Sequence, residues 1–191
     1  VTFEQIDPLF TIDLSDPTTP VILGELEVTG YSTYLHPVGE DQLLALGLEI
    51  DPNGIIVEGL SVSWFDVSDL EAPTLFDRLV FSGHGWSWSE ALYDHHAITY
   101  HRDVLSFPRY RWTYGQGYES SLAVIDAVPG QPLLHLGDIP HDDLGPPDRY
   151  NRVRRSVVIE DWLYSISDAG MKVTPLRNPS NVVATVEFSQ E

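Results

Sequence analysis

The chain has 191 residues, of which 42% are hydrophobic and 11% aromatic, with 14 glycines and 14 prolines. This composition is typical of a folded, turn-rich protein and excludes a disordered chain. The formal net charge of −19 repels phosphate backbones and anionic lipids, so we expect no nucleic-acid partner. No apolar run is long enough to insert into a membrane, and the absence of cysteine excludes disulfides, thiolate metal sites and a cysteine nucleophile.

A repeated strand pattern runs through the chain in sequence order. Its copies read PLFTIDLSDPTTP, LSVSWFDVSDLEAP and SLAVIDAVPGQP, each an alternating strand that ends in an aspartate and enters a proline-containing turn. The equivalent aspartates are Asp13, Asp66 and Asp126, spaced by 53 and 60 residues. A fourth, degenerate copy near the end has Thr174 where the aspartate would fall. Such a period indicates a repeat architecture.

A second repeating unit lies between these copies and consists of two strands joined by a tight turn. Its copies read STYLHPVGEDQLLALG, EALYDHHAITYHRDVLSF and RVRRSVVIEDWLYS. Alignment through the turns places His36, His96 and Ser156 at equivalent sites. It also places Asp94 and His96 on one strand, where alternate residues share a face.

One period therefore holds four strands, which is the content of a propeller blade. The sequence predicts an all-β fold, a β-propeller of about 3.5 four-stranded antiparallel blades. The half-blade spans 1–30 and the blades span 31–82, 83–140 and 148–190, while a β-sandwich is the alternative. Because an unclosed ring exposes sheet edges and apolar faces, we expect a missing propeller segment or a second copy of the chain to complete it.

These segments also resemble a known family. The strand ends IDLSDP and FDVSD, the hairpin YLHPVGEDQLLALG and the strand ALYDH are similar to those of bacterial and archaeal secreted proteins with a C-terminal β-propeller domain, distantly like WD-type repeats. The resemblance covers most of the chain and is weaker from about Asp138 onward. It implies a propeller and a secreted or cell-surface location, but no reaction.

Four polar residues are candidates for a shared ligand site. Tyr34 and His36 precede one turn, and Asp94 and His96 lie at the corresponding place one blade later. Convergence near a channel mouth would let His36, Asp94 and His96 bind a divalent metal through imidazole and carboxylate groups. No chelating motif supports such a site, so a hydrogen-bonding role for these histidines is the alternative and we expect no other cofactor.

An arginine-rich segment precedes the last predicted blade. Arg154 and Arg155 belong to a run with four arginines in seven residues, beginning at Arg149. Guanidinium groups match carboxylate and other anions, so Arg154 and Arg155 are candidate ligand-binding residues. The alternative is pairing with acidic residues of neighbouring blades, such as Asp142 and Asp143.

Aromatic residues gather in the third predicted segment, where they either line a carbohydrate-binding face or fill gaps between blades. They are Trp86, Trp88, Tyr93, Tyr110, Trp112, Tyr114 and Tyr118. No nucleophile elbow or phosphate loop occurs. The sequence therefore favours a non-catalytic extracytoplasmic module that binds a protein or glycan. The alternative is a hydrolase or lyase with a His/carboxylate site, with or without a metal ion, at the channel mouth.

Overall fold

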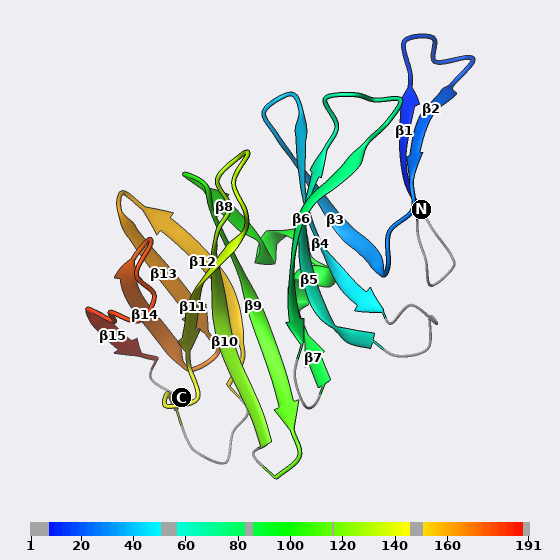
Figure 1. Ribbon diagram of the computed structural model, residues 1–191. Coiled ribbons are helices and arrows are strands. Elements are labelled where there is room, and N and C mark those ends of the chain that lie inside the picture. The colour runs from blue at the N-terminus through cyan, green and yellow to red at the C-terminus, as the bar shows by residue number, and fades with distance from the viewer. Residues whose placement is uncertain (1–7, 51–56, 83–85, 116, 146–150, 189–191) are drawn as a thin grey trace. The chain divides into compact units, whose positions relative to one another are not determined.

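The computed structural model describes residues 8–50, 57–82, 86–115, 117–145 and 151–188, which form antiparallel sheets (Figure 1). The chain divides into two compact units, residues 1–82 and 83–191, and each is described by itself. Among the described residues, no helix has the length and apolar character needed to cross a membrane.

The first unit contains two sheets. The smaller pairs β1 (Leu9–Asp13) with β2 (Val21–Leu26). The larger has four strands in sequence order, namely β3 (Tyr31–Val38), β4 (Gln42–Ile50), β5 (Val57–Asp66) and β6 (Thr74–Ser82). Strand β4 reads QLLALGLEI and is largely buried because it lies between two neighbours, as its near-continuous apolar run indicates.

The second unit also contains two sheets. One runs in the order β11-β10-β9-β7 with β8 also on β9; its strands are β7 (Trp86–Trp88), β8 (Thr99–His101), β9 (Val104–Thr113), β10 (Gly117–Asp126) and β11 (Leu134–Pro140). The other runs in sequence order through β12 (Val153–Ile159), β13 (Trp162–Ser167), β14 (Gly170–Pro175) and β15 (Ala184–Glu187). Between β7 and β8 lie two short 3₁₀ turns, η1 (Glu90–Leu92) and η2 (His95–Ala97).

Each four-stranded repeat is built from two hairpins, which we call leading (β3–β4, β8–β9, β12–β13) and trailing (β5–β6, β10–β11, β14–β15). One backbone hydrogen bond links them in every repeat, from the residue after the trailing hairpin's first strand to the aspartate in the leading turn. The three bonds are Val67 N to Asp41 O at 2.8 Å, Ala127 N to Asp103 O at 2.7 Å and Leu176 N to Asp161 O at 2.9 Å. This recurring bond fixes the equivalence of the repeats.

The register corrects the sequence alignment at two points. Pro175, not Thr174, is equivalent to Asp66 and Asp126, since it directly precedes the bonded Leu176. The turn after β3 has one residue more than the turn after β12, because Val38 pairs with Gln42 whereas Ile159 pairs with Trp162. The site equivalent to Ser156 is therefore Leu35 rather than His36, and His96 lies outside any strand.

Each unit has its own apolar core. In the first unit, Ala45, Phe65 and Val67 of the larger sheet are covered by β1, β2 and the residues that follow β2, through Leu9, Leu26 and Val28. In the second unit, one cluster joins the two sheets and comprises Val104, Leu122, Val124, Ile139, Val153, Leu163 and Leu176. Alternation along each strand thus buries one side-chain set against a neighbouring sheet.

The β1–β2 hairpin lies close to the turn that follows β5. Thr11 donates its hydroxyl to Leu70 O, and a Cβ at Gly24 would lie 2.5 Å from the same oxygen. Asp13 and Asp66 begin equivalent turns by accepting the backbone N–H of Ser15 and Ser68 at 2.8 and 2.9 Å. The backbone bond from Ser15 lowers the pKa of Asp13, and the hydroxyl of Ser68, followed by its backbone N–H, lowers the pKa of Asp66.

Candidate ligand-binding face

The expected strand around Asp94 is replaced by η1 and η2. Ser89 caps η1 by accepting Ala91 N–H at 3.1 Å, and its own hydroxyl donates to Pro108 O at 2.5 Å. Asp94 caps η2 by accepting the His96 N–H at 2.9 Å. The strand prediction was wrong here because β7 already pairs with β9 at Tyr110–Trp112, so the following residues leave the sheet.

The two turns bring carboxylates to the arginines of β12. Arg154 binds Glu90 Oε2 at 3.0 Å through Nη1 and Asp168 Oδ1 at 2.9 Å through Nε. Arg155 binds Asp94 Oδ2 at 2.6 Å through Nη2, and its Nη1 lies 3.3 Å from Glu90 Oε1. We call these five residues the arginine cluster.

Electrostatics within the arginine cluster favour the charged forms. Hydrogen bonds that Arg154 donates to Asp168 raise the pKa of Arg154, and those to Glu90 add to this effect. Hydrogen bonds from the backbone and ring of His96 lower the pKa of Asp94, with a smaller contribution from the charge of Arg155. Two guanidinium groups thus face three carboxylates, so an incoming anion would have to displace a bound carboxylate. Their acidic partners are these three residues, whereas the sequence had suggested Asp142 and Asp143.

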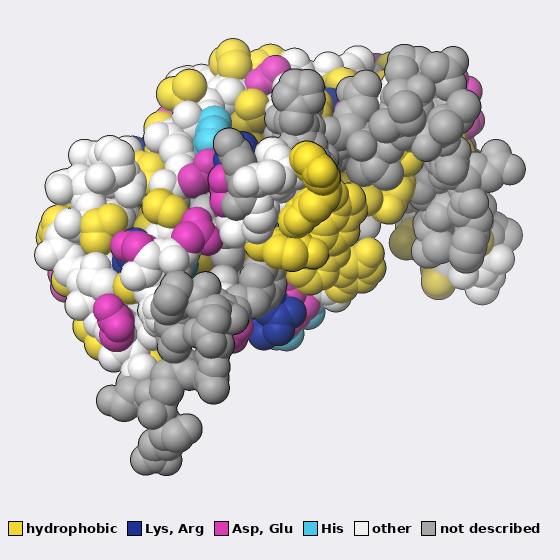
Figure 2. Space-filling view, turned by 90° about the horizontal axis from the view of Figure 1, so that it is seen from below, with side chains coloured by type: hydrophobic (Ala, Val, Ile, Leu, Met, Phe, Trp, Pro, Cys, Tyr) yellow, Lys and Arg dark blue, Asp and Glu magenta, His cyan; other side chains and the backbone are white. Residues whose placement is uncertain are grey.

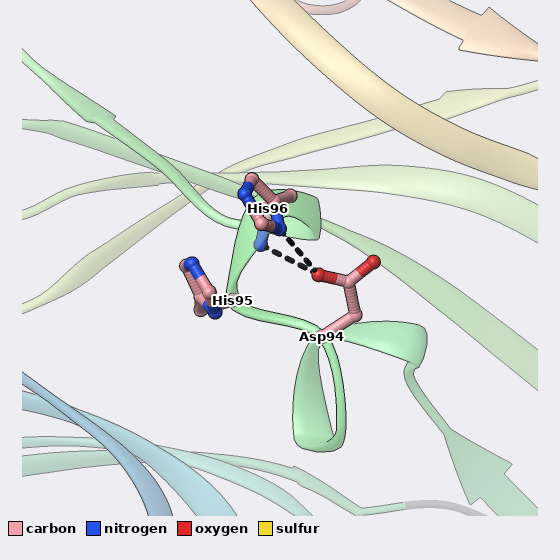
Figure 3. A group of neighbouring side chains, drawn as sticks. All are labelled: Asp94, His95 and His96. Carbon is pink, nitrogen blue, oxygen red and sulfur yellow. Dashed lines mark hydrogen bonds and ion pairs between the residues drawn. The ribbon is translucent and has the colours of Figure 1, made fainter.

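Two residues of the metal-ligating set expected from the sequence, Asp94 and His96, lie together in the second unit. With His95 they place one ligand atom each within 4.8 Å of one another (Figure 3). His95 joins the predicted pair because a 3₁₀ turn gathers consecutive residues that a strand would separate. Asp94 already accepts from the His96 ring at 2.9 Å and from Arg155, so a metal ion would compete with both contacts.

Tyr34 and His36 belong to the first unit, whereas the other four predicted site residues belong to the second. The Tyr34 hydroxyl lies 3.0 Å from His36 Nδ1, and the two rings stack with centroids 6.0 Å apart. These two residues thus form a local pair on β3.

Aromatic side chains form a cross-strand row on β7, β9 and β10. Trp86 pairs with Trp112, which in turn pairs with Tyr118. Residues directly opposite one another in an antiparallel sheet share a face, so the three rings stand side by side. Tyr114, in the β9–β10 turn, meets Trp112 edge to face at 6.4 Å. We call these four residues the aromatic platform.

The aromatic platform is open to solvent and is supported from one side. The exposed fractions are 55% for Trp86, 37% for Trp112, 89% for Tyr114 and 58% for Tyr118. Trp88 lies on the same sheet face and stacks on Trp86 and on the buried Tyr110, with centroids 6.4 and 5.0 Å apart. Figure 2 looks onto the end at which the β9–β10 turn lies in Figure 1 and shows hydrophobic side chains gathered in a patch. Contiguous exposed aromatic surface of this kind is typical of interaction sites.

Comparison with known proteins places this geometry in a family. The model of the β-propeller domain family matches residues 1–178. The chain belongs to the β-propeller domain family. A protein of Archaeoglobus fulgidus, described as uncharacterized, is 32% identical over 176 residues, which are 91% of this chain and 23% of that protein. Another such protein, from Methanocaldococcus jannaschii, is 30% identical over 190 residues, 98% of this chain and 26% of its own length. The chain thus spans about a quarter of these relatives.

A histidine–serine pair also lies in this propeller chain, but it is enclosed. His141 Nε2 lies 2.7 Å from Ser165 Oγ, and both residues have an exposed fraction of 0%. Nearby, Lys172 Nζ binds Asp143 Oδ1 at 2.6 Å and Pro140 O at 2.8 Å. Because neither His141 nor Ser165 reaches solvent, the His141–Ser165 pair fastens β13 to the residues after β11 and does not present a nucleophile.

All four residues of the aromatic platform were among the aromatic residues singled out in the sequence, but the sequence did not separate them from the others. The alternation Trp86-Ser-Trp88 assigns two rings to one face of their strand, and Tyr110-Arg-Trp112 does the same for another strand. Only the pairing of β7 with β9 places these rings on the same face of one sheet. Glu90 and Asp168 were missed as partners of the arginines. Their only signal was a position beside a turn, which does not specify a partner distant in sequence.

Proposed function

We propose that this part of the propeller is an extracytoplasmic, non-catalytic binding module whose aromatic platform takes a neutral glycan. The exposed row formed by Trp86, Trp112 and Tyr118 is the observation that carries the proposal. Tryptophan and tyrosine rings offer a flat apolar face and a polar edge, and such residues dominate binding energy at recognition sites. The extracytoplasmic location follows the family resemblance of the sequence.

The net charge of the chain favours a neutral ligand over an acidic one. Arg111 and Glu119, on the next rung, pair with each other across the strands and point to the opposite face of the sheet from the row. The chain as a whole carries a formal net charge of −19. An acidic polysaccharide would therefore meet repulsion, whereas the C–H face of a neutral sugar can lie on the rings.

The enzyme alternative has less support from the geometry. Within the arginine cluster, Arg154 already binds Glu90 and Arg155 binds Asp94. His141 is buried against Ser165. A general acid or base must reach its substrate within hydrogen-bonding distance. These groups instead satisfy each other, which supports a structural role for them.

The proposal is tested by titrating the chain with soluble neutral polysaccharides, laminarin and dextran, and with acidic alginate, while following tryptophan fluorescence and heat. We expect a neutral polysaccharide to bind and Trp112→Ala to weaken that binding by about tenfold or more. Trp162→Ala is the matched control, since Trp162 is 38% exposed against 37% for Trp112 but lies on β13. Absence of binding to all three, or equal affinities of wild type and Trp112→Ala, would contradict the proposal. A lower affinity for alginate supports the charge argument.

A further inference from the structure

A short turn in the second unit gathers three side chains that can ligate a metal ion. Asp94, His95 and His96 are the one such group found among the described residues. Asp94 is half-buried, whereas both histidines are exposed. Figure 3 shows the Asp94 carboxylate turned toward the His96 ring, with His95 beside that ring. The two imidazole rings are therefore accessible to an ion from solvent.

The fold fixes the carboxylate of this group before any ion binds. Asp94 caps η2, and its Oδ1 accepts the backbone N–H of His96 at 2.9 Å. The other oxygen, Oδ2, is bound by Arg155 at 2.6 Å. A ligand that is already held in position loses little conformational freedom when an ion binds to it. Folding thus supplies the first ligand and places the His96 ring next to it.

The spacing between Asp94 and His96 suits a single ion. Asp94 Oδ1 lies 2.9 Å from His96 Nδ1. Two atoms that each bind Zn²⁺ at about 2.0 to 2.2 Å lie about 3.0 to 3.5 Å apart in octahedral or tetrahedral geometry. An ion can therefore take the place of the ring hydrogen between these two atoms, and that hydrogen then moves to Nε2. The contact of Arg155 is opposed by charge alone, because it uses the other carboxylate oxygen.

His95 supplies the third ligand. The centroid of its ring lies 4.0 Å from that of the His96 ring. Because the His95 side chain is exposed, a change of its rotamer brings a ring nitrogen to the ion without disturbing the core. Consecutive residues of a strand point to opposite faces, so it is the 3₁₀ turn that lets both histidines bind together. Three protein ligands with an open side leave a position for water.

The charge around the group favours a cation. The arginine cluster, to which Asp94 belongs, holds three carboxylates and two guanidinium groups, which leaves one negative charge in excess. The chain as a whole carries a formal net charge of −19. A dication at Asp94 therefore reduces the repulsion among the acidic groups of the chain.

We infer that Asp94, His95 and His96 bind one divalent ion of the Zn²⁺ or Ni²⁺ class. Two imidazoles among three ligands favour such ions over Ca²⁺ and Mg²⁺, which prefer oxygen ligands. The site is complete within three consecutive residues, whereas the set expected from the sequence required His36 of the first unit. It is also independent of the proposed glycan binding, because none of its ligands belongs to the aromatic platform.

The test titrates the untagged 191-residue chain with ZnCl₂, NiCl₂ and CaCl₂ in a calorimeter. We expect one Zn²⁺ or Ni²⁺ ion per chain and an affinity for Ca²⁺ that is weaker by about tenfold or more. His95→Ala should weaken Zn²⁺ binding by about tenfold or more, because it removes one of three ligands. His101→Ala is the matched control, since His101 is also an exposed histidine of the second unit but lies outside the group.

Any of four results would overturn the inference. The first is no binding of Zn²⁺ or Ni²⁺ at concentrations up to about 1 mM. The second is equal Zn²⁺ affinity of His95→Ala and His101→Ala, and the third is a loss at His36→Ala as large as at His95→Ala. The fourth is Ca²⁺ binding as tight as Zn²⁺ binding, which would assign the ion to acidic groups alone. His95 and His101 are exposed, so neither substitution is expected to unfold the chain.

Discussion

His141 is a buried residue whose surroundings oppose protonation. Burial, and next the positive charge of Lys172, lower its pKa from 6.5 to about 4. The ring is held by Ser165 on β13, and the backbone N–H of His141 donates to Ser120 O at 3.0 Å. A neutral imidazole is therefore part of the folded structure between the two sheets of the second unit.

Stability should fall as the pH decreases from about 6.5 toward 4, because the unfolded chain then binds a proton at His141 that the folded chain does not. The contribution of this one residue reaches about 1.4 kcal/mol per pH unit. Urea unfolding at about pH 7 and about pH 5 measures it. His141→Gln should lose less stability between the two pH values than wild type or the control Leu134→Ala, and equal losses would disprove the assignment.

The contacts of single residues were only partly predictable from the sequence. That Arg154 and Arg155 pair with acidic groups follows from the need to compensate charge within a packed repeat. The sequence does not reveal which carboxylates they contact, because Glu90 is 64 residues and Asp168 14 residues away from Arg154 along the chain. Only the folded topology of η1 and the β13–β14 turn brings those groups together.

At the scale of elements, Ser89 determines where the chain leaves the sheet. Ser89→Ala would remove the acceptor for Ala91 N–H and the donor to Pro108 O in a fully buried position. We expect a loss of about 1–3 kcal/mol in the free energy of unfolding, measured with urea. Ser68→Ala serves as the control, because it removes only the hydroxyl that donates to Asp66 Oδ1 in an exposed turn, and we expect a change below about 1 kcal/mol. A loss at Ser89 no larger than that at Ser68 would contradict this role.

The strands that end in Asp13, Asp66 and Asp126 were predictable because the same alternating pattern ends in an aspartate each time. At Asp13 and Asp66 this aspartate also begins an Asx turn. The η1 and η2 turns were not recognised. Their capping residues, Ser89 and Asp94, were present in the sequence, but the repeat alignment imposed a strand over them. Period matching therefore fails where one repeat replaces part of a strand with turns.

For the molecule as a whole, periodicity predicted the propeller, which the family match and the antiparallel sheets confirm. It also predicted an exposed face on the last sheet. Val157, Ile159, Trp162 and Val186 are 44%, 53%, 38% and 47% exposed there. Val104, Leu122 and Val124 of the preceding sheet, which pack toward β12–β15, are exposed by 2% or less. The exposed fractions differ because, among the described residues, the face of the preceding sheet is covered by β12–β15, whereas the face of β12–β15 that carries Val157 and Ile159 has no neighbouring sheet.

This exposed face should make association of the chain depend on salt. At low ionic strength the net charge of −19 keeps copies apart, whereas about 1 M salt shortens the screening length to about 3 Å and strengthens apolar contact. Sedimentation velocity should therefore show association that increases with salt. Joint substitution of Val157→Asp and Ile159→Asp should abolish the increase, because it places charge on the apolar face, while Leu134→Asp on β11 should preserve it. An increase that survives in the double variant would show that another surface is responsible.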